Sequence, residues 1–195
     1  MKQDLPDAAL AIASRDGDHA AFAVLMGRHK LWLYRFVKRY VADRDEAYDI
    51  VQESFVSVWS ALARYDTARP FEAWLRRIAL NKCRDRARRN AVRKAALSFV
   101  TLTQTAFGIE SSSPPADKDW HSQNALKRLE QAVASLPRAL KEPLVLTMLE
   151  GLSQKDAGEV LGINAKAVET RVYRAKKRLA LMLDPSDLED LAGKN

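Results

Sequence analysis

The sequence is poor in the features that cross-link a chain or hold it in a membrane. It has one cysteine, Cys83, among its 195 residues, so it forms no internal disulfide, and this fits a reducing compartment. Cys83 falls near the apolar side of a predicted helix, where it is expected to act as a packing residue and not as a nucleophile. No apolar run reaches the roughly 20 residues of a membrane-spanning helix, and the N-terminus does not have the pattern of a signal peptide. We therefore expect a cytoplasmic protein without membrane insertion.

The groupings typical of catalysis are also missing. No Ser/His/Asp or Cys/His combination and no metal-ligating cluster occurs at usable spacing, so we expect no catalytic residue, no metal site and no cofactor. Hydrophobic residues make up 47% of the chain and charged residues 29%, which is typical of a folded protein. The net charge is +7 and the isoelectric point is near 9.6, which favours a polyanionic partner.

Hydrophobic residues recur at helical spacing over most of the chain, which predicts an all-α protein. The pattern decays between Ala95 and Trp120, a stretch that includes Pro114 and Pro115. We therefore predict two small helical domains, residues 1–94 and 122–183, joined by a flexible linker over residues 95–121. Residues 184–195 form an acidic tail to which we assign no role.

A helix predicted to begin near Asp43 has two different faces. Its apolar stripe consists of Val51, Phe55, Val58 and Leu62. A second side carries Asp45, Asp49 and Gln52, flanked by Glu46 and Glu53. By periodicity alone, this acidic side is either a solvated surface or a binding face.

The next segment is strongly basic. From Arg69 to Lys94 it has ten basic residues against two acidic ones, Glu72 and Asp85. On a helix that follows Pro70, four polar side chains lie within roughly 60° of one another: Arg77, Asn81, Arg84 and Arg88. Guanidinium groups with an interposed amide suit phosphates and one base edge. The alternative is a solubilising surface, but such surfaces usually mix charges of both signs.

The region from Ser153 to Arg178 predicts a helix-turn-helix. Ser153 and Asn164 are suited to cap its two helices, and Gly162 provides the turn. Six basic residues lie between Asn164 and Arg178, against Glu169 alone. The side opposite the apolar stripe carries Lys166, Thr170, Tyr173, Arg174 and Lys177. Such a second helix is suited to the major groove of DNA, although a helical hairpin with a basic exterior is the alternative. Just upstream, Pro143 predicts a boundary or kink near Glu142.

With these motifs in order, the chain resembles a sigma factor of the extracytoplasmic-function (ECF) group, the small two-domain form within the bacterial sigma-70 family. Residues 43–59 resemble the helix that binds core RNA polymerase, and residues 69–89 resemble the segment that melts the minus-ten promoter element. Residues 122–180 resemble region 4, whose helix-turn-helix contacts the minus-thirty-five element. The resemblance covers both predicted domains.

The resemblance implies a transcription initiation factor and assigns roles to positions. The implied partners are core RNA polymerase, through its beta-prime and beta subunits, promoter DNA and an anti-sigma factor. The implied polymerase-binding residues are Asp45, Asp49, Gln52 and Glu53. The residues implied for the minus-ten element are combined here with the arginine row of the basic helix. Together they are Tyr65, Asp66, Arg69, Arg77, Asn81, Arg84, Asp85 and Arg88. Those expected at the minus-thirty-five element are Lys166, Thr170, Arg171, Tyr173, Arg174 and Lys177.

Two positions depart from the family pattern. Gly158 stands where alanine is usual and is expected to weaken its helix by up to about 1 kcal/mol. Glu169 stands where a basic residue is common, and it either accepts from a cytosine amine or repels phosphate. Two other functions compete with a sigma factor. A stand-alone DNA-binding regulator leaves the acidic face and the arginine row unexplained, and the two basic helices argue against a pure interaction protein.

Overall fold

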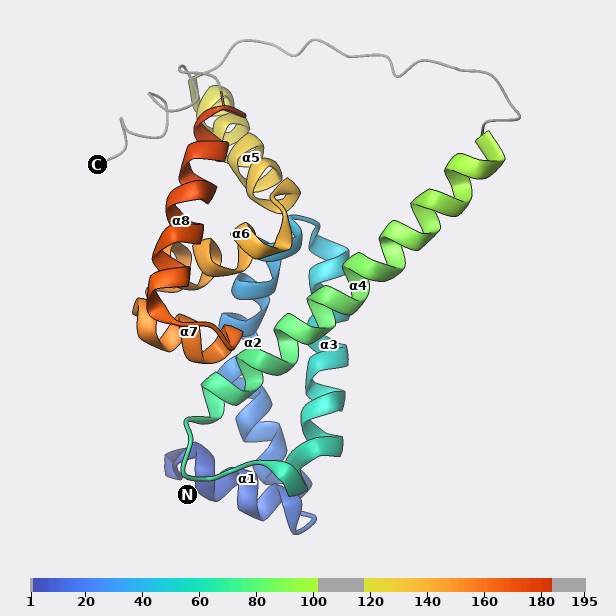
Figure 1. Cartoon of the computed structure of the whole chain (residues 1–195). Coiled ribbons are helices and arrows are strands. Elements are labelled where there is room, and N and C mark those ends of the chain that lie inside the picture. The colour runs from blue at the N-terminus through green and yellow to red at the C-terminus, as the bar shows by residue number, and fades with distance from the viewer. Residues whose placement is uncertain (1, 102–117, 184–195) are drawn as a thin grey trace.

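The computed structural model describes residues 2–101 and 118–183, and side chains for residues 2–93 and 125–183 (Figure 1). Its helices, in chain order, are η1 (Lys2–Asp4), α1 (Asp7–Arg15), α2 (His19–Val41), α3 (Arg44–Ala61), η2 (Leu62–Arg64), α4 (Phe71–Thr101), α5 (Lys118–Ser135), α6 (Arg138–Leu144), η3 (Val145–Leu149), α7 (Gln154–Leu161) and α8 (Ala165–Ala180). These two ranges contain no strand. The predicted all-α class with two helical domains is confirmed.

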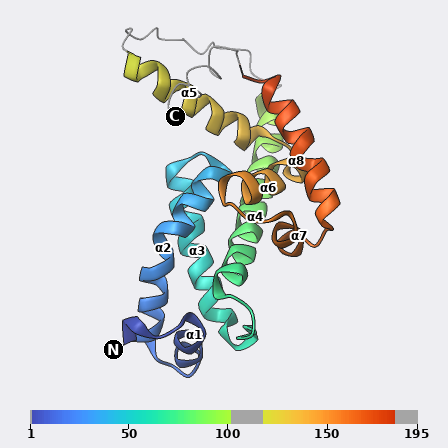
Figure 2. The ribbon, with the colours of Figure 1, turned by 90° about the vertical axis from the view of Figure 1, so that its left-hand side faces the viewer.

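The first domain is built around α2, α3 and α4. Figures 1 and 2 show α2 and α3 side by side, with α4 packed across them. Their apolar stripes meet in one core, in which Leu33, Phe36, Ile50 and Leu75 are fully buried. Burial of such side chains stabilises the folded state by about 1.5–3 kcal/mol each. The core thereby fixes which sides of α3 and α4 remain available for other contacts.

Four polar residues cap helix N-termini, because the first backbone N–H groups of a helix have no partner within it. Each side chain accepts hydrogen bonds from N–H groups two or three residues further on. The distances are 3.0 and 3.1 Å for Asp18, 2.8 Å for Asp43, 3.1 Å for Ser153 and 2.7 Å for Asn164. The predicted caps of the helix-turn-helix are thus confirmed, and Gly162 makes its turn with a φ of 70°.

The helices beside the predicted linker are longer than expected. The sequence prediction ended the helical pattern at Lys94 and resumed it at Ser122, but α4 continues to Thr101 and α5 begins at Lys118. The C-terminal end of α4 projects away from the rest of the molecule (Figure 1). The rest of the linker, residues 102–117, and the acidic tail lie outside the described residues.

The sequence predicts a boundary or kink near Glu142, and α6 ends two residues further on, at Leu144. The backbone then widens into the π-helical segment η3. There the N–H of Glu150 donates to the carbonyl of Val145, five residues back, at 3.0 Å. Because Pro143 has no N–H to donate to the carbonyl four residues back, the regular ladder of α6 is interrupted just before η3.

The second domain packs its helices α6, α7 and α8 around a smaller core. Val145, Leu146, Val168 and Ala175 are fully buried in it. The domain also contacts the first: α5 and η3 pack on α2, and α7 packs on α4. Among the described residues, no helix combines the length and hydrophobicity that a membrane span requires.

Gly158 of α7 is required by close packing within the helix-turn-helix. A Cβ atom at this position would lie 2.6 Å from the carbonyl oxygen of Ile163, in the turn before α8. A backbone atom at that distance cannot move aside cheaply, so the expectation of a merely weakened helix understates the role of this glycine.

We predict that Gly158→Ala lowers the free energy of unfolding of the second domain by about 1–3 kcal/mol, since it overpacks a tight site. Gly27→Ala is the matched control, because a Cβ on Gly27 in α2 meets nothing within 4 Å. The control should stabilise the protein by about 0.5–1 kcal/mol through helix propensity. Chemical denaturation followed by circular dichroism measures both. A stabilising Gly158→Ala would contradict the packing argument.

Cys83 lies fully buried in α4, as its predicted packing role requires. Burial raises the pKa of its thiol to about 12, with the charge of Glu46 as a further cause. The thiol is therefore protonated throughout the physiological pH range. Since the thiolate is the reactive form, the folded protein holds this residue chemically inert.

We predict that at pH 8 a chromogenic disulfide reagent reacts with Cys83 at least about a thousandfold more slowly in the folded protein than in the denatured chain. The factor follows from a thiol pKa that rises from 9.0 to about 12 on folding. Stopped-flow absorbance in buffer and in guanidinium chloride measures the two rates. A folded rate within tenfold of the denatured rate would show that the thiol is accessible.

Candidate functional site

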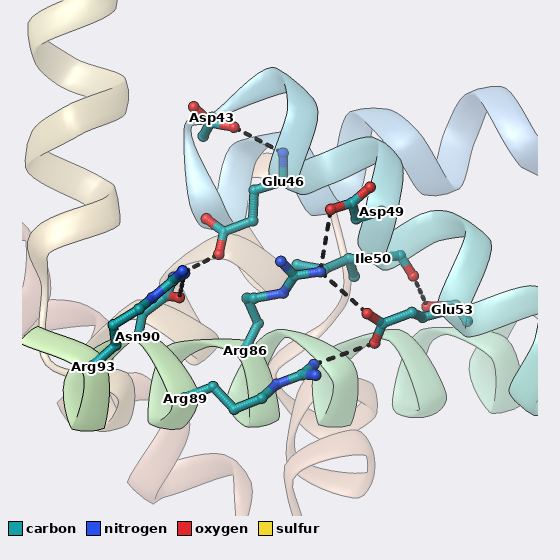
Figure 3. A network of polar contacts seen from close by, with 10 residues as sticks. Asp43, Glu46, Asp49, Ile50, Glu53, Arg86, Arg89, Asn90 and Arg93 are labelled. Atoms are coloured by element: carbon teal, nitrogen blue, oxygen red, sulfur yellow. Dashed lines mark hydrogen bonds and ion pairs between the residues drawn. The ribbon is translucent and has the colours of Figure 1, made fainter.

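Part of the acidic side of α3 contacts α4, and the rest faces solvent (Figure 3). Glu46 accepts from the side-chain amide of Asn90 at 2.8 Å. Glu53 pairs with Arg86 at 3.1 Å and with Arg89 at 3.3 Å. These contacts fix how α3 and α4 pack, so part of the acidic side acts within the domain.

The outer part of this side remains open. Asp45 and Gln52 are exposed. Asp49 touches Arg86 at 3.4 Å, yet its side chain keeps 61% of its surface exposed. Glu53, at 35% exposure, forms the border between the two parts. All four predicted polymerase-binding residues therefore lie along one edge of α3, and Asp45 and Gln52 have the greatest freedom to meet a partner.

The residues of the predicted arginine row on α4 also differ in their surroundings. Arg77, Asn81 and Arg88 are exposed, and Arg88 pairs loosely with Asp85 at 3.2 Å. Arg84 donates to Asn81 at 2.9 Å. Its guanidinium is otherwise turned toward the second domain, where it makes the contacts with Glu142 described below.

A shallow groove runs between α3 and α4 and connects the two predicted sites. Two adjoining hollows share Val56, Ser57 and Lys82. One reaches Asp49, Gln52 and Glu53, and the other reaches Asn81 and Asp85. Val56 is 67% exposed at the centre of the groove, which gives a surface of mixed charge an apolar contact point. A macromolecule bound to the acidic edge would thus lie next to the polar residues of α4.

The loop before α4 is held in shape by Tyr65. Its ring is buried beside Phe71 and Trp74, and its hydroxyl donates to the backbone carbonyl of Arg69 at 2.6 Å. Burial raises the pKa of this hydroxyl, and the charges of nearby aspartates, Asp66 among them, add to the shift. Tyr65 therefore shapes the loop from within, although the sequence placed it among the DNA-contacting residues.

The exposed part of the loop lines a hollow. Asp66 and Arg69 are exposed, and their side chains meet at 3.4 Å. The loop and residues of α1 and α2, Asp7 and Arg28 among them, surround the hollow. Its lining includes carboxylates, guanidinium groups and the aromatic residues Tyr65 and Phe71. These are the kinds of group that hydrogen-bond to an unpaired base or stack on it.

In the helix-turn-helix, α8 presents its predicted polar side to solvent. Lys166, Thr170, Tyr173, Arg174 and Lys177 are all exposed, whereas Arg171 is half-buried. Glu169 pairs with Lys166 at 2.9 Å, so it partly neutralises the N-terminal end of the basic side. Val168 and Ala175 hold the opposite side in the core. This is the arrangement of a helix that can enter a DNA groove.

The sequence analysis missed a set of polar contacts between the domains. Glu142 accepts from Arg84 at 2.7 and 2.8 Å and from Tyr40 at 3.2 Å. This bidentate hydrogen bonding raises the pKa of Arg84. Glu142 of α6 is nearly fully buried. Its place next to Pro143, amid apolar residues, was a signal of burial, but no local pattern names a partner about 58 residues away.

Fold and surfaces together define a two-domain helical protein that is suited to bind nucleic acid, and comparison with known proteins agrees. The family model of sigma-70 region 2 matches residues 25–93, and that of sigma-70 region 4 matches residues 126–179. RNA polymerase sigma factor CnrH of Cupriavidus metallidurans is 34% identical over 186 residues, which are 94% of this chain and 97% of CnrH. Sigma factor NccH of Alcaligenes xylosoxydans is 33% identical over 182 residues, 93% of this chain and 97% of NccH.

Solved structures show the same fold. The structure of CnrH in complex with the cytosolic domain of CnrY has a TM-score of 0.64 at 32% identity, and it covers 90% of this chain and 96% of CnrH. A sigma factor from Bartonella quintana, solved with the anti-sigma factor NepR, is similar in fold, with a TM-score of 0.61 at 22% identity over 83% of this chain and 95% of that one. The chain therefore belongs to the sigma-70 family of RNA polymerase sigma factors, in its ECF group.

We predict that Tyr65→Phe lowers the free energy of unfolding by about 1 kcal/mol, because the carbonyl of Arg69 loses its partially buried donor. Tyr173→Phe is the matched control: its ring is 64% exposed on α8, so the same change should stay within about 0.5 kcal/mol. Urea denaturation measures the free energy of unfolding of both variants and of the wild-type protein. Equal stability of the two variants would mean that the Tyr65 hydroxyl does not support the loop.

Proposed function

We propose that the exposed edge of α3 is the surface that binds core RNA polymerase. Asp45, Asp49, Gln52 and Glu53 form this edge, and the exposure of Asp45 and Gln52 supports the assignment. The engagement of Glu53 by Arg86 and Arg89 supports a secondary role for it, as a residue that positions the edge. The contacted subunit is beta-prime, and the second domain adds a contact to beta.

The loop and the exposed side of α4 open and hold the minus-ten element. Unpaired bases must be captured while cations hold the phosphates, and the hollow beside the loop lies next to α4. Asp66 and Arg69 contribute from the loop, shaped by Tyr65. The contributing residues of α4 are Arg77, Asn81, Arg84, Asp85 and Arg88.

The second domain binds the minus-thirty-five element through α8. Lys166, Thr170, Tyr173, Arg174 and Lys177 face the groove and its phosphates, and Arg171 supports them from the side. Glu169 lies among them and is held by Lys166. It can release Lys166 to a phosphate and accept from a cytosine amine, which favours a promoter with cytosine at that position.

The function is non-enzymatic, since RNA polymerase supplies the chemistry of transcription, and the protein acts in the bacterial cytoplasm. The functional domains are residues 1–94 and 122–183, and both family matches lie within these ranges. An anti-sigma factor regulates the protein by covering these surfaces. The structure of CnrH with the cytosolic domain of CnrY supports regulation by a protein partner. The observation that carries the proposal is the presence, on one chain, of an acidic edge, a basic helix beside it and an exposed recognition helix.

Run-off transcription with core RNA polymerase and a genomic promoter library tests the function. Discrete start sites that share two upstream elements are the expected result. Core binding without transcripts would indicate a sigma mimic. DNA binding without core binding would indicate a stand-alone regulator.

We predict that Asp45→Asn/Gln52→Ala weakens binding to core polymerase by about tenfold or more, because both side chains lie on the proposed contact edge. Asp16→Asn, an exposed change on another part of the domain, should leave affinity unchanged. Fluorescence anisotropy with labelled core polymerase measures both.

Arg174→Ala should weaken promoter binding by about tenfold, whereas Lys30→Ala should not. Wild-type behaviour of both test variants would refute the assigned surfaces.

A further inference from the structure

The cations of α8 are left largely unneutralised by the part of the chain that the structure describes. α8 packs on α6 and α7, and its opposite side is exposed. Lys166 pairs with Glu169 at 2.9 Å. No other cation of the helix has a described carboxylate within ion-pair distance. We call the six cations of this helix its basic side; they are Lys166, Arg171, Arg174, Lys176, Lys177 and Arg178.

The basic side chains of α4 differ in this respect. Four of its arginines each have a carboxylate at 2.7 to 3.3 Å; they are Arg84, Arg86, Arg88 and Arg89. An acidic segment that bound α4 would have to displace these carboxylates. One that bound α8 would form ion pairs that the described part of the chain does not supply. Of the two basic helices, α8 therefore has the greater unused capacity for negative charge.

The exposed surface of α8 also has apolar contact points. The ring of Tyr173 is 64% exposed, and the ammonium of Lys177 lies 6.0 Å from the centre of this ring. At the C-terminal end of the helix, Leu181 is 86% exposed and Met182 is 45% exposed. A segment suited to this surface combines carboxylates with apolar side chains.

The acidic tail, residues 184–195, has this composition. It carries four carboxylates against a single base, Lys194, and the acids are interspersed with Leu188 and Leu191. The four carboxylates are those of Asp184, Asp187, Glu189 and Asp190. Carboxylates form charge-assisted hydrogen bonds with arginine and lysine, as DNA phosphates do. The acidic tail is thus complementary to the basic side of α8 in charge, and its leucines match the exposed apolar groups there.

The acidic tail is also long enough and starts in the right place. Leu183 precedes it and is buried, and its N–H donates to the carbonyl of Leu179 at 3.1 Å, so the chain leaves the second domain at the C-terminal end of α8. The 16 residues of α8 rise by about 24 Å. Residues 184–195 can span up to about 40 Å when extended. They can reach the whole basic side, and the tether raises their local concentration to about the millimolar range.

We propose that the acidic tail binds along the basic side of α8 in the free protein and that DNA must displace it. The second part of this statement rests on the proposed function of α8 as the helix that enters DNA. Tail carboxylates then take the positions of DNA phosphates. The fraction of molecules in which α8 is free of the acidic tail sets the apparent affinity of this helix for DNA.

The first test locates the acidic tail in the full chain by paramagnetic relaxation. Gly193→Cys introduces one reactive thiol for a nitroxide label, because Cys83 is buried and inert. We expect the label to broaden the backbone amide signals of Lys166 to Tyr173, in the half of α8 far from the start of the tail. The broadening should fade at about 0.5 M salt, which screens the ion pairs.

The matched control is a neutral tail with the same label. It carries Asp184→Asn, Asp187→Asn, Glu189→Gln and Asp190→Asn, which keep its length and remove its charge. Broadening in the N-terminal half of α8 should be lost in this control. On the other side of the contact, Arg174→Ala/Lys177→Ala should reduce the broadening by about half or more. Lys30→Ala/Arg35→Ala, which removes two exposed cations of α2, should leave it unchanged.

The second test measures competition with a mixed-sequence DNA duplex of about 20 base pairs, which offers phosphates to α8. Saturating duplex should abolish the broadening in α8 of the labelled chain. By fluorescence anisotropy, Glu189→Gln/Asp190→Asn should bind the duplex about threefold more tightly than the wild-type chain, because more molecules have a free α8. Asp4→Asn/Asp16→Asn removes the same charge at exposed positions of the first domain and should change the affinity less than about 1.5-fold.

The proposal is overturned if acidic and neutral tails broaden α8 equally, if bound duplex leaves the broadening unchanged, or if the two double variants bind the duplex alike. A failure of the proposed function gives a different result. The duplex would then bind neither the wild-type chain nor the neutral-tail chain, which refutes the competition, while the label still decides whether the acidic tail lies on α8.

Discussion

The pairing of buried charge on α4 is the constraint on which the rest of the structure depends. This helix is the most basic element of the chain, yet the other helices pack on it from several sides. The other helices can pack on α4 because the cations on its packed sides pair with carboxylates. Arg86 pairs with Glu53 of α3, and Arg84 pairs with Glu142 of the second domain. An unpaired guanidinium in either position would be costly. The exposed side of the helix keeps its charge at the surface, where it is available for the nucleic-acid contact proposed above.

The same constraint explains why single surfaces serve two purposes. On α3, Glu46 and Glu53 hold α4 in place, while Asp45 and Gln52 face outward. The division of one acidic side thus holds α3 on α4 and leaves exposed residues for the polymerase contact proposed above. The loop before α4 follows the same principle. Tyr65 shapes it from inside, and the residues around Tyr65 remain accessible.

The contact between the domains gives the molecule a closed form. Two of the carboxylates in this contact, those of Glu142 and Glu150, are almost fully buried and well paired, and such pairs resist screening by salt better than surface pairs do. In this form the guanidinium of Arg84 is already satisfied by the carboxylate of Glu142.

The sequence by itself determined the all-helical class, the two domains, the caps Ser153 and Asn164, and the sides of α3, α4 and α8 that carry charge. These properties depend on residues three or four positions apart, and periodicity contains that information. The ends of α4 and α5 were misjudged because the periodic pattern decays there while the backbone is still helical. Only the tertiary structure decided that Arg86 is structural, that Tyr65 points inward, that Gly158 has no room for a methyl group and that Arg84 is held by Glu142. Each depends on atoms that are brought together by packing, and no local pattern specifies which distant carboxylate a buried arginine will meet.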